Sequence, residues 1–190
     1  SFNWLDVPVS VRKDLLKGHI PLFGVKWLWD RPDHHWSWHC APENNNRWDA
    51  GFFHTTPFRQ GNRTGDIRIS WEASRLQHLI ALALIARSSS NAREKKDAVE
   101  IYTRDLISWC DQNPKLTGIH YISAMECALR ILSISISFDL IRDELGDKKC
   151  DVVRVVSHVI PEHAAFITKR MSLHSSAGNH VLAESVGLIF

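Results

Sequence analysis

An amide and an imidazole stand side by side near the end of the chain. Asn179 and His180 follow a Ser-Ser-Ala-Gly turn and precede the apolar stretch 181–190. The amide can donate hydrogen bonds to a carboxylate, and imidazole is the side chain that most readily exchanges a proton near neutral pH. The pair therefore predicts a site that holds a carboxylate and moves a proton. In the alternative interpretation Asn179 caps the last helix, since Asn is a favoured N-cap residue, and His180 is a buried core histidine.

Two earlier stretches carry further chemistry-bearing residues. The segment 66–79 contains a Trp-Glu-x-x-Arg pattern at 71–75. In the segment 109–130, a Trp, an Asn-Pro pair and a Gly lead into a Glu-x-Ala-x-Arg pattern. Together with the Asn-His and Leu-x-Glu of 179–184, and in this order, these patterns resemble the helical domain of the heparinase II/III-like polysaccharide lyases, a group that includes alginate lyases.

The resemblance covers roughly residues 60–190 and implies an (α/α) toroid that acts on an acidic polysaccharide without a cofactor. It also implies a periplasmic or secreted location and a C-terminal β-sandwich domain in the full-length protein. A Tyr on a later helix usually serves as acid or base in this family, so we expect the chain up to Phe190 to be catalytically incomplete. The chain departs from the family pattern at Gly178 and Ser74, where the family often has Asn.

The reaction implied by the resemblance is β-elimination on a uronic acid. Removal of the C5 proton next to the sugar carboxylate builds up a second negative charge, which hydrogen-bond donors aimed at the carboxylate can stabilise. Asn179 is the expected carboxylate neutraliser, and His180 is a candidate for the base or for orienting the base. Glu184 lies one helical turn after His180, so it could orient the imidazole or form an ion pair within the helix layer.

The remaining candidates are substrate-binding residues, and each has a structural alternative. Arg75 and His78 could face the cleft, but buried Arg and Glu side chains are most often paired with one another. Tyr121, in the loop after Gly118, could stack on a sugar or simply close the helical hairpin. Trp71 is a further candidate, from the Trp-Glu-x-x-Arg pattern.

From Ser70 onward the apolar residues recur with a helical period. The pattern predicts helices at about 71–87, 94–111, 123–145, 151–171 and 178–190, with the third ended by Gly146 and the fourth kinked or split at Pro161. Some of these helices are apolar on nearly all sides and others carry one apolar stripe. This alternation predicts an all-α, incomplete toroid of helical hairpins, and a compact helical bundle is the alternative.

Residues 1–66 are rich in Trp, His, Pro and Gly and show little periodicity, so we expect an irregular aromatic-rich arm before a helical domain at 67–190. Most indoles of the arm should pack it against the helices, although some could stack on sugar rings. They are Trp27, Trp29, Trp36, Trp38 and Trp48. The cluster of His34, His35, His39 and Cys40 has no second ligand pair with zinc-site spacing, so we predict no metal site.

Composition narrows the class of protein without identifying it. The chain has 190 residues, 44% hydrophobic and 23% charged, which is typical of a globular domain. A net charge of +2 without a Lys/Arg run argues against a nucleic-acid partner, and no apolar run reaches the ~18 residues of a membrane span. We see no signal peptide and no disulfide framework in the four cysteines. Two other functions stay open: a glycoside hydrolase on a similar toroid and a non-catalytic glycan-binding domain.

Overall fold

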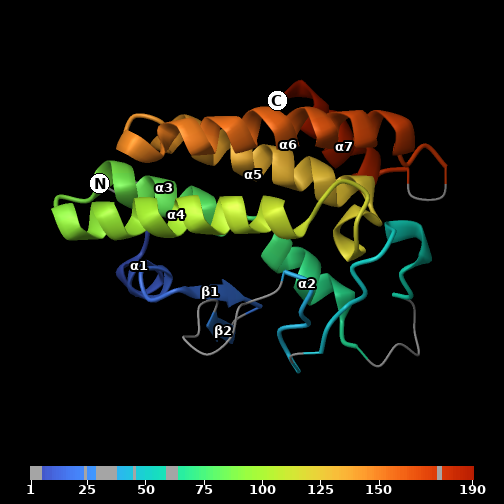
Figure 1. Ribbon diagram of the computed structural model, residues 1–190, viewed down its shortest axis with the longest axis horizontal. Helices are drawn as coiled ribbons and strands as arrows, with labels where there is room; N and C mark the ends of the chain where they lie inside the picture. Colours follow the sequence, from blue (N-terminus) through green and yellow to red (C-terminus); the bar gives the residue numbers. More distant parts are fainter. Residues whose placement is uncertain (1–5, 24, 29–37, 45, 59–63, 175–176) are drawn as a thin grey trace.

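The computed structural model describes residues 6–23, 25–28, 38–44, 46–58, 64–174 and 177–190, and it is mostly helical (Figure 1). The N-terminal elements are α1 (Val9–Leu15), the strands β1 (His19–Leu22) and β2 (Val25–Leu28), and the short 3-10 helix η1 (Phe53–Thr55). The remaining elements are α2 (Ile67–Ser74), α3 (His78–Ser88), α4 (Ala92–Gln112), η2 (Ile119–Tyr121), α5 (Ala124–Ile141), η3 (Gly146–Lys148), α6 (Lys149–Arg170) and α7 (Asn179–Ile189).

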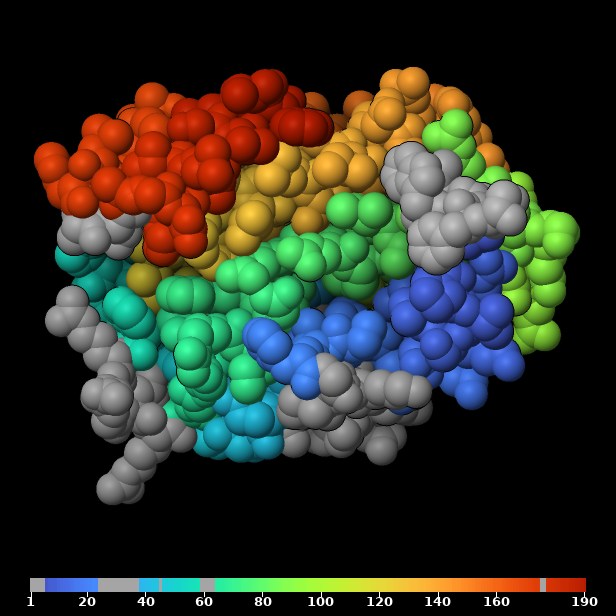
Figure 2. Space-filling view, turned by 180° about the vertical axis from the view of Figure 1, so that it is seen from behind, coloured from blue at the N-terminus to red at the C-terminus, as the bar shows by residue number. Residues whose placement is uncertain are grey.

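The long helices form two layers. In Figure 1, α4 and α6 lie in front, with α3 and α5 behind them. Seen from behind, α7, α5 and α3 lie side by side on one face (Figure 2). The helix α5 contacts α3, α6 and α7, and is the central element of the fold. The all-helical prediction for the region after residue 66 is therefore confirmed, since no strand of the described residues follows Ile67.

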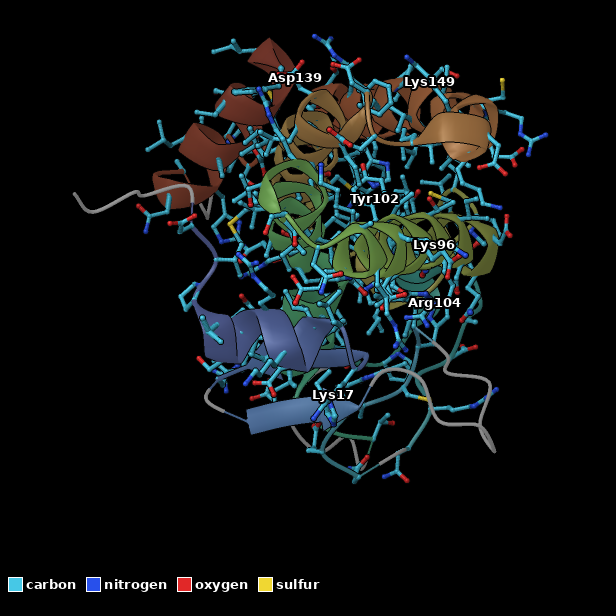
Figure 3. All side chains as sticks on the ribbon, turned by 90° about the vertical axis from the view of Figure 1, so that its left-hand side faces the viewer. Lys17, Lys96, Tyr102, Arg104, Asp139 and Lys149 are labelled. Carbon is cyan, nitrogen blue, oxygen red and sulfur yellow. The ribbon has the colours of Figure 1, made fainter. Side chains whose placement is uncertain are left out.

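The burial of each helix follows its apolar pattern. Helix α3 buries residues on several sides, whereas α4 buries one stripe that includes Tyr102, Leu106 and Trp109. Figure 3 shows Tyr102 between the helix layers and Lys96 at the outside of α4. Asn91 begins α4 by accepting hydrogen bonds from the backbone N–H groups of the first turn. Among the described residues, no helix combines the length and apolar character that crossing a membrane would demand.

The prediction of one helix over 71–87 is wrong, because the chain turns sharply between α2 and α3. Leu76 adopts a left-handed conformation with φ of 59° and is completely buried. Such a conformation costs on the order of 1–3 kcal/mol in a residue other than Gly. Burial of a leucine side chain contributes about 1.5–3 kcal/mol, which offsets this cost. No Gly or Pro marks the turn, so the local sequence carries no signal for it.

Two other predicted helix features differ from the structure. Helix α5 ends at Ile141, and Gly146 instead opens η3 with a φ of 52°. Of the two outcomes predicted for Pro161, a kink or a split, the split does not occur, because α6 continues from Lys149 to Arg170. The carbonyl of Ser157 loses its helical partner at this point, but Ser157 and Pro161 are both exposed. Water can therefore satisfy the carbonyl, which makes the proline tolerable.

The N-terminal region is more regular than expected. It contains α1 and an antiparallel hairpin in which His19 pairs with Leu28, so an irregular arm is the wrong description of residues 9–28. Leu15, Leu22 and Trp38 belong to the same hydrophobic core as α3 and α4. Trp38 and Trp48 are both buried, as the packing interpretation predicted, and the predictions for Trp29, Trp36 and the side chain of Trp27 fall outside the described residues.

Candidate functional site

Asn179 and His180 form the first turn of α7. Gly178, with φ of 114°, occupies the N-cap position, and no side chain of the described residues caps this helix end. Asn179 is exposed, His180 is half-buried, and neither side chain makes a hydrogen bond to any described residue. The alternative in which Asn179 is the helix cap is therefore wrong. An unpaired amide and imidazole at the positive end of a helix can receive an anionic group.

Glu184 is completely buried and forms neither a hydrogen bond nor an ion pair with His180. Its carboxylate accepts hydrogen bonds from the backbone N–H of Ser172 at 2.8 Å and from the Ser172 hydroxyl at 2.7 Å. Glu184 therefore ties the segment that follows α6 to α7. Neither of its two predicted roles, orienting the imidazole or forming an ion pair, is observed.

Arg75 joins the turn between α2 and α3 to the start of α5. Its guanidinium donates two hydrogen bonds of 2.9 Å to Glu126 and a further one to Glu72. These contacts, led by the hydrogen bonds that Arg75 donates to Glu126, raise the pKa of Arg75. Glu126 is completely buried in the first turn of α5, where the helix dipole favours a negative charge. The single positive charge of Arg75 is therefore paired with two carboxylates. These ion pairs are structural, as the alternative interpretation predicted.

The other predicted binding residues differ in exposure. Trp71 is half-buried and its indole N–H donates to the carbonyl of Ile119 at 2.9 Å. His78 is buried, lies 3.2 Å from the Asp105 carboxylate and stacks on Trp38. Tyr121 has no exposed surface, so its ring offers no face to a sugar in this conformation. Of these three residues, Trp71 alone retains a substantial accessible surface.

An interior polar network around Arg130 was not recognised as a network from the sequence. The buried guanidinium donates to His163 Nε2 at 2.9 Å, to the carbonyl of His120 at 2.6 Å and to Cys127 Sγ at 3.3 Å. It also lies 4.8 Å from the ring centre of Trp109. The Glu-x-Ala-x-Arg pattern pointed to Arg130, and Cys127 lies within the same helix, but the other two hydrogen-bond partners come from η2 and from α6.

The histidines of this network are neutral. Burial lowers the pKa of His120 and of His163 well below the usual range, and the nearby Arg130 charge adds to the effect. His120 Nε2 lies 2.7 Å from the carbonyl of Trp38 and 3.2 Å from the hydroxyl of Ser74. Ser74 is therefore a buried structural residue and cannot contact a sugar.

One glycine close to this network has no space for a side chain. Gly118 has φ of 65°, and a Cβ atom there would overlap the ring of His39, which contacts His120. The imidazole of His39 lies 3.1 Å from the carbonyl of Gln112. His39 and Cys40 are thus part of the packed structure, and the described residues contain no group of three metal-ligating side chains. His34 and His35 fall outside the described residues.

All four cysteines are free thiols. Cys127 is completely buried, and burial raises its pKa to about 11. Cys110 is partly buried in the core, where burial again raises the pKa of the thiol, to about 12. These two residues are inert at neutral pH, because the thiolate is the reactive form. Comparison of the chain with protein-family models, curated proteins and solved structures gave no match.

Proposed function

We propose that this chain is the helical, toroid-forming domain of a lyase that cleaves a uronate-containing polysaccharide by β-elimination. The observation that carries the proposal is the state of Asn179 and His180. They are an adjacent amide and imidazole at the positive end of α7, with no hydrogen-bond partner among the described residues. Buried polar groups that serve the fold are usually paired, as Glu126 and Glu184 are here, whereas Asn179 is accessible.

In the proposed reaction Asn179 neutralises the substrate carboxylate. Its Nδ2 group donates a hydrogen bond to the carboxylate, and the dipole of the eleven-residue helix α7 adds a favourable field. His180 then removes the proton from C5. The electron pair of the C5–H bond forms the C4–C5 double bond, the C4–O4 bond breaks, and a general acid protonates the departing O4. The family resemblance assigns this last step to a tyrosine of a later helix.

The surrounding residues would hold this site in place. Trp71 retains partial exposure and is the proposed contact with the sugar chain. Arg75 is held by Glu72 and Glu126, so the role we propose for it is to position the turn between α2 and α3. His78, Tyr121 and Glu184 are buried, so the role we propose for them is to position the elements that carry the surface. The resemblance further suggests a β-sandwich partner domain and a periplasmic or secreted location.

An absorbance assay for the unsaturated uronide product tests the activity. The substrates are alginate, heparan sulfate, hyaluronan and polyglucuronate, and the chain is compared with a longer form that supplies the expected tyrosine. In the active form Asn179→Ala should lower turnover roughly 10²–10³-fold, the scale for loss of one donor to a developing oxyanion. The control is Asn44→Ala, which removes an exposed amide that hydrogen-bonds only backbone groups, the carbonyl of Thr64 and the N–H of Asn46. Absence of product from every substrate with both forms would refute lyase activity.

A non-catalytic glycan-binding domain is the second candidate. It is favoured by one observation: Glu184 is held by Ser172 and no described residue orients the His180 imidazole. A general base usually needs such an orienting group. Binding of a polysaccharide without release of unsaturated product, in both forms of the chain, would support this candidate.

A further inference from the structure

We propose that an exposed surface formed by Phe52, His54 and Arg170 binds a short stretch of an acidic polysaccharide, in addition to the site at Asn179 and His180. The ring of Phe52 would stack on a sugar ring, and the guanidinium of Arg170 would pair with a sugar carboxylate. The choice of a polysaccharide as the partner rests on the proposed function. Figure 1 shows the segment with η1 near the end of α6 at which the loop to α7 begins.

The ring of Phe52 is an exposed aromatic group on a fixed backbone. Phe52 is 54% exposed and meets the buried ring of Phe53 edge-on, with ring centres 4.9 Å apart. On one side of Phe52, the N–H of Gly118 donates to the carbonyl of Gly51 at 2.7 Å. On the other side, the N–H of Phe53 donates to the carbonyl of Leu116 at 3.0 Å. A flat apolar ring that is held in advance can stack on the apolar face of a sugar at little entropic cost.

The guanidinium of Arg170 is held by two buried rings. Its Cζ atom lies 5.1 Å from the ring centre of Phe53 and 5.9 Å from that of Phe166, distances at which a cation is attracted to an aromatic ring. Arg170 is exposed and forms no hydrogen bond or ion pair with any described residue. Its N–H groups are therefore available to a carboxylate, which guanidinium binds strongly.

Phe53 is the common neighbour that brings these groups together. Its ring lies 4.9 Å from the ring of Phe52, 5.7 Å from that of His54 and 5.1 Å from the guanidinium of Arg170. His54 is exposed, so its imidazole can bind a sugar hydroxyl. The helix dipole favours a cation in the last turn of α6, which accounts for the charge of Arg170 but not for the exposed ring of Phe52.

The charges around this surface favour an anionic partner. The nearest carboxylates in the flanking sequence both have partners: Asp49 accepts a backbone hydrogen bond of 2.9 Å within its own turn, and Glu162 lies 4.0 Å from Lys115. Lys169, next to Arg170, is exposed and forms no ion pair with a described residue. The net charge of +2 without a Lys/Arg run argues against a nucleic acid as this anion.

Two oligosaccharides that differ only in charge test the partner. The chain with Asn179→Ala, which suppresses cleavage, is titrated calorimetrically with β-1,4-linked hexaglucuronate and with cellohexaose. Hexaglucuronate should bind about 10-fold more tightly or better, as expected for hydrogen bonds to a charged group. Equal binding of cellohexaose would overturn the role of Arg170. Tighter binding of single-stranded hexathymidylate, or absence of hexaglucuronate binding, would overturn the proposal.

Substitutions in the same background test the surface. Phe52→Ala should weaken hexaglucuronate binding about threefold to tenfold, the scale for one stacked ring. Arg170→Gln should weaken it about 10-fold or more and abolish the preference over cellohexaose. Both residues are exposed, so the urea midpoint should stay close to that of the parent chain. Parent affinity in either variant would overturn the assignment.

Matched controls come from exposed residues elsewhere. Phe23→Ala removes a ring that is 69% exposed at the N-terminal hairpin. Arg154→Gln removes an exposed guanidinium of α6 that donates to Asp151 at 2.8 Å. Neither variant should change hexaglucuronate binding, and a loss equal to that in Phe52→Ala or Arg170→Gln would show that the effect is not specific to this surface.

An absorbance assay separates this proposal from the proposed lyase activity. In the active form, Phe52→Ala should raise KM and leave kcat unchanged, because the ring binds the glycan and contacts no reacting atom. Turnover with an unchanged KM would overturn this surface alone. Loss of binding in Phe52→Ala without turnover in any form of the chain would overturn the lyase and support this surface.

Discussion

The two polar regions that the sequence motifs single out are built in opposite ways. At the start of α7, Asn179 and His180 are accessible and have no hydrogen-bond partner among the described residues. Where α5 begins, Glu126 is completely buried and its carboxylate is occupied by Arg75, while Arg130 one turn later donates to His163 and a backbone carbonyl. The residues of these sequence motifs thus divide into accessible side chains and side chains that hold helices together.

The largest effect on stability should come from removing the carboxylate of Glu126. Glu126→Ala leaves Arg75 partly buried beside a cavity. The variant should lower the free energy of unfolding by about 3 kcal/mol. This value is near the low end for a broken buried ion pair, because the Arg75 side chain is 21% exposed. Urea denaturation measures it. Glu100→Ala, which removes an exposed carboxylate 3.8 Å from Lys96, is the control and should change stability by less than about 0.5 kcal/mol. Equal effects of the two variants would mean that the Arg75 pair does not stabilise the fold.

Acidification should weaken the interior network before it affects α7. His120 and His163 have depressed pKa values in the folded chain because they are buried. The unfolded chain therefore binds more protons below its ordinary histidine pKa of about 6.5, and stability falls as the pH decreases. Two such groups lower the free energy of unfolding by at most about 2.7 kcal/mol for each pH unit below that pKa. The check is the urea midpoint measured from pH 7.5 to pH 5.

The variant His163→Gln isolates one of these groups. Its amide oxygen can still accept the hydrogen bond from Arg130, but the side chain does not titrate. The pH dependence should become shallower by about half of the joint contribution of His120 and His163. An unchanged slope would assign the acid sensitivity to other residues.

A substitution that disturbs the close packing of α7 on α5 should have an intermediate effect on stability. A Cβ atom added at Gly187 would lie 2.7 Å from the Cβ and 2.8 Å from the Cα of Ala128, so α7 would have to move away from α5. We expect Gly187→Ala to cost about 1–3 kcal/mol, the usual range for overpacking. Ser185→Ala in the same helix is the control and should be nearly neutral. A neutral Gly187→Ala, measured by thermal unfolding, would show that α7 can shift freely.

The smallest effect on stability should come from a substitution in the exposed pair of Asn179 and His180. Asn179→Ala removes an exposed amide without a partner and should change the free energy of unfolding by no more than about 0.5 kcal/mol. A loss above 1 kcal/mol in urea denaturation would identify Asn179 as a structural residue and would weaken the proposed catalytic role.

The helices after residue 66 were largely predictable, because apolar periodicity and strong caps act locally. The bounds of α4 and α7 agree with the predicted helices to within about two residues, a usual uncertainty for helix ends. The turn at Leu76 could not be predicted, since its left-handed conformation depends on burial of that side chain by distant helices. The regular elements α1, β1 and β2 were also missed in a segment whose composition suggested irregularity.

Residue types near the candidate site were readable from the sequence, whereas their partners were not. The sequence alone determined that an amide and an imidazole begin α7 and that an Arg and two Glu lie on neighbouring helices. Only the tertiary structure decided that Glu184 binds Ser172, that Tyr121 is buried, and that Phe53 lies against Arg170. The physical reason is that helix formation depends on neighbours within one or two turns, while the pairing of buried polar groups depends on which helices pack together.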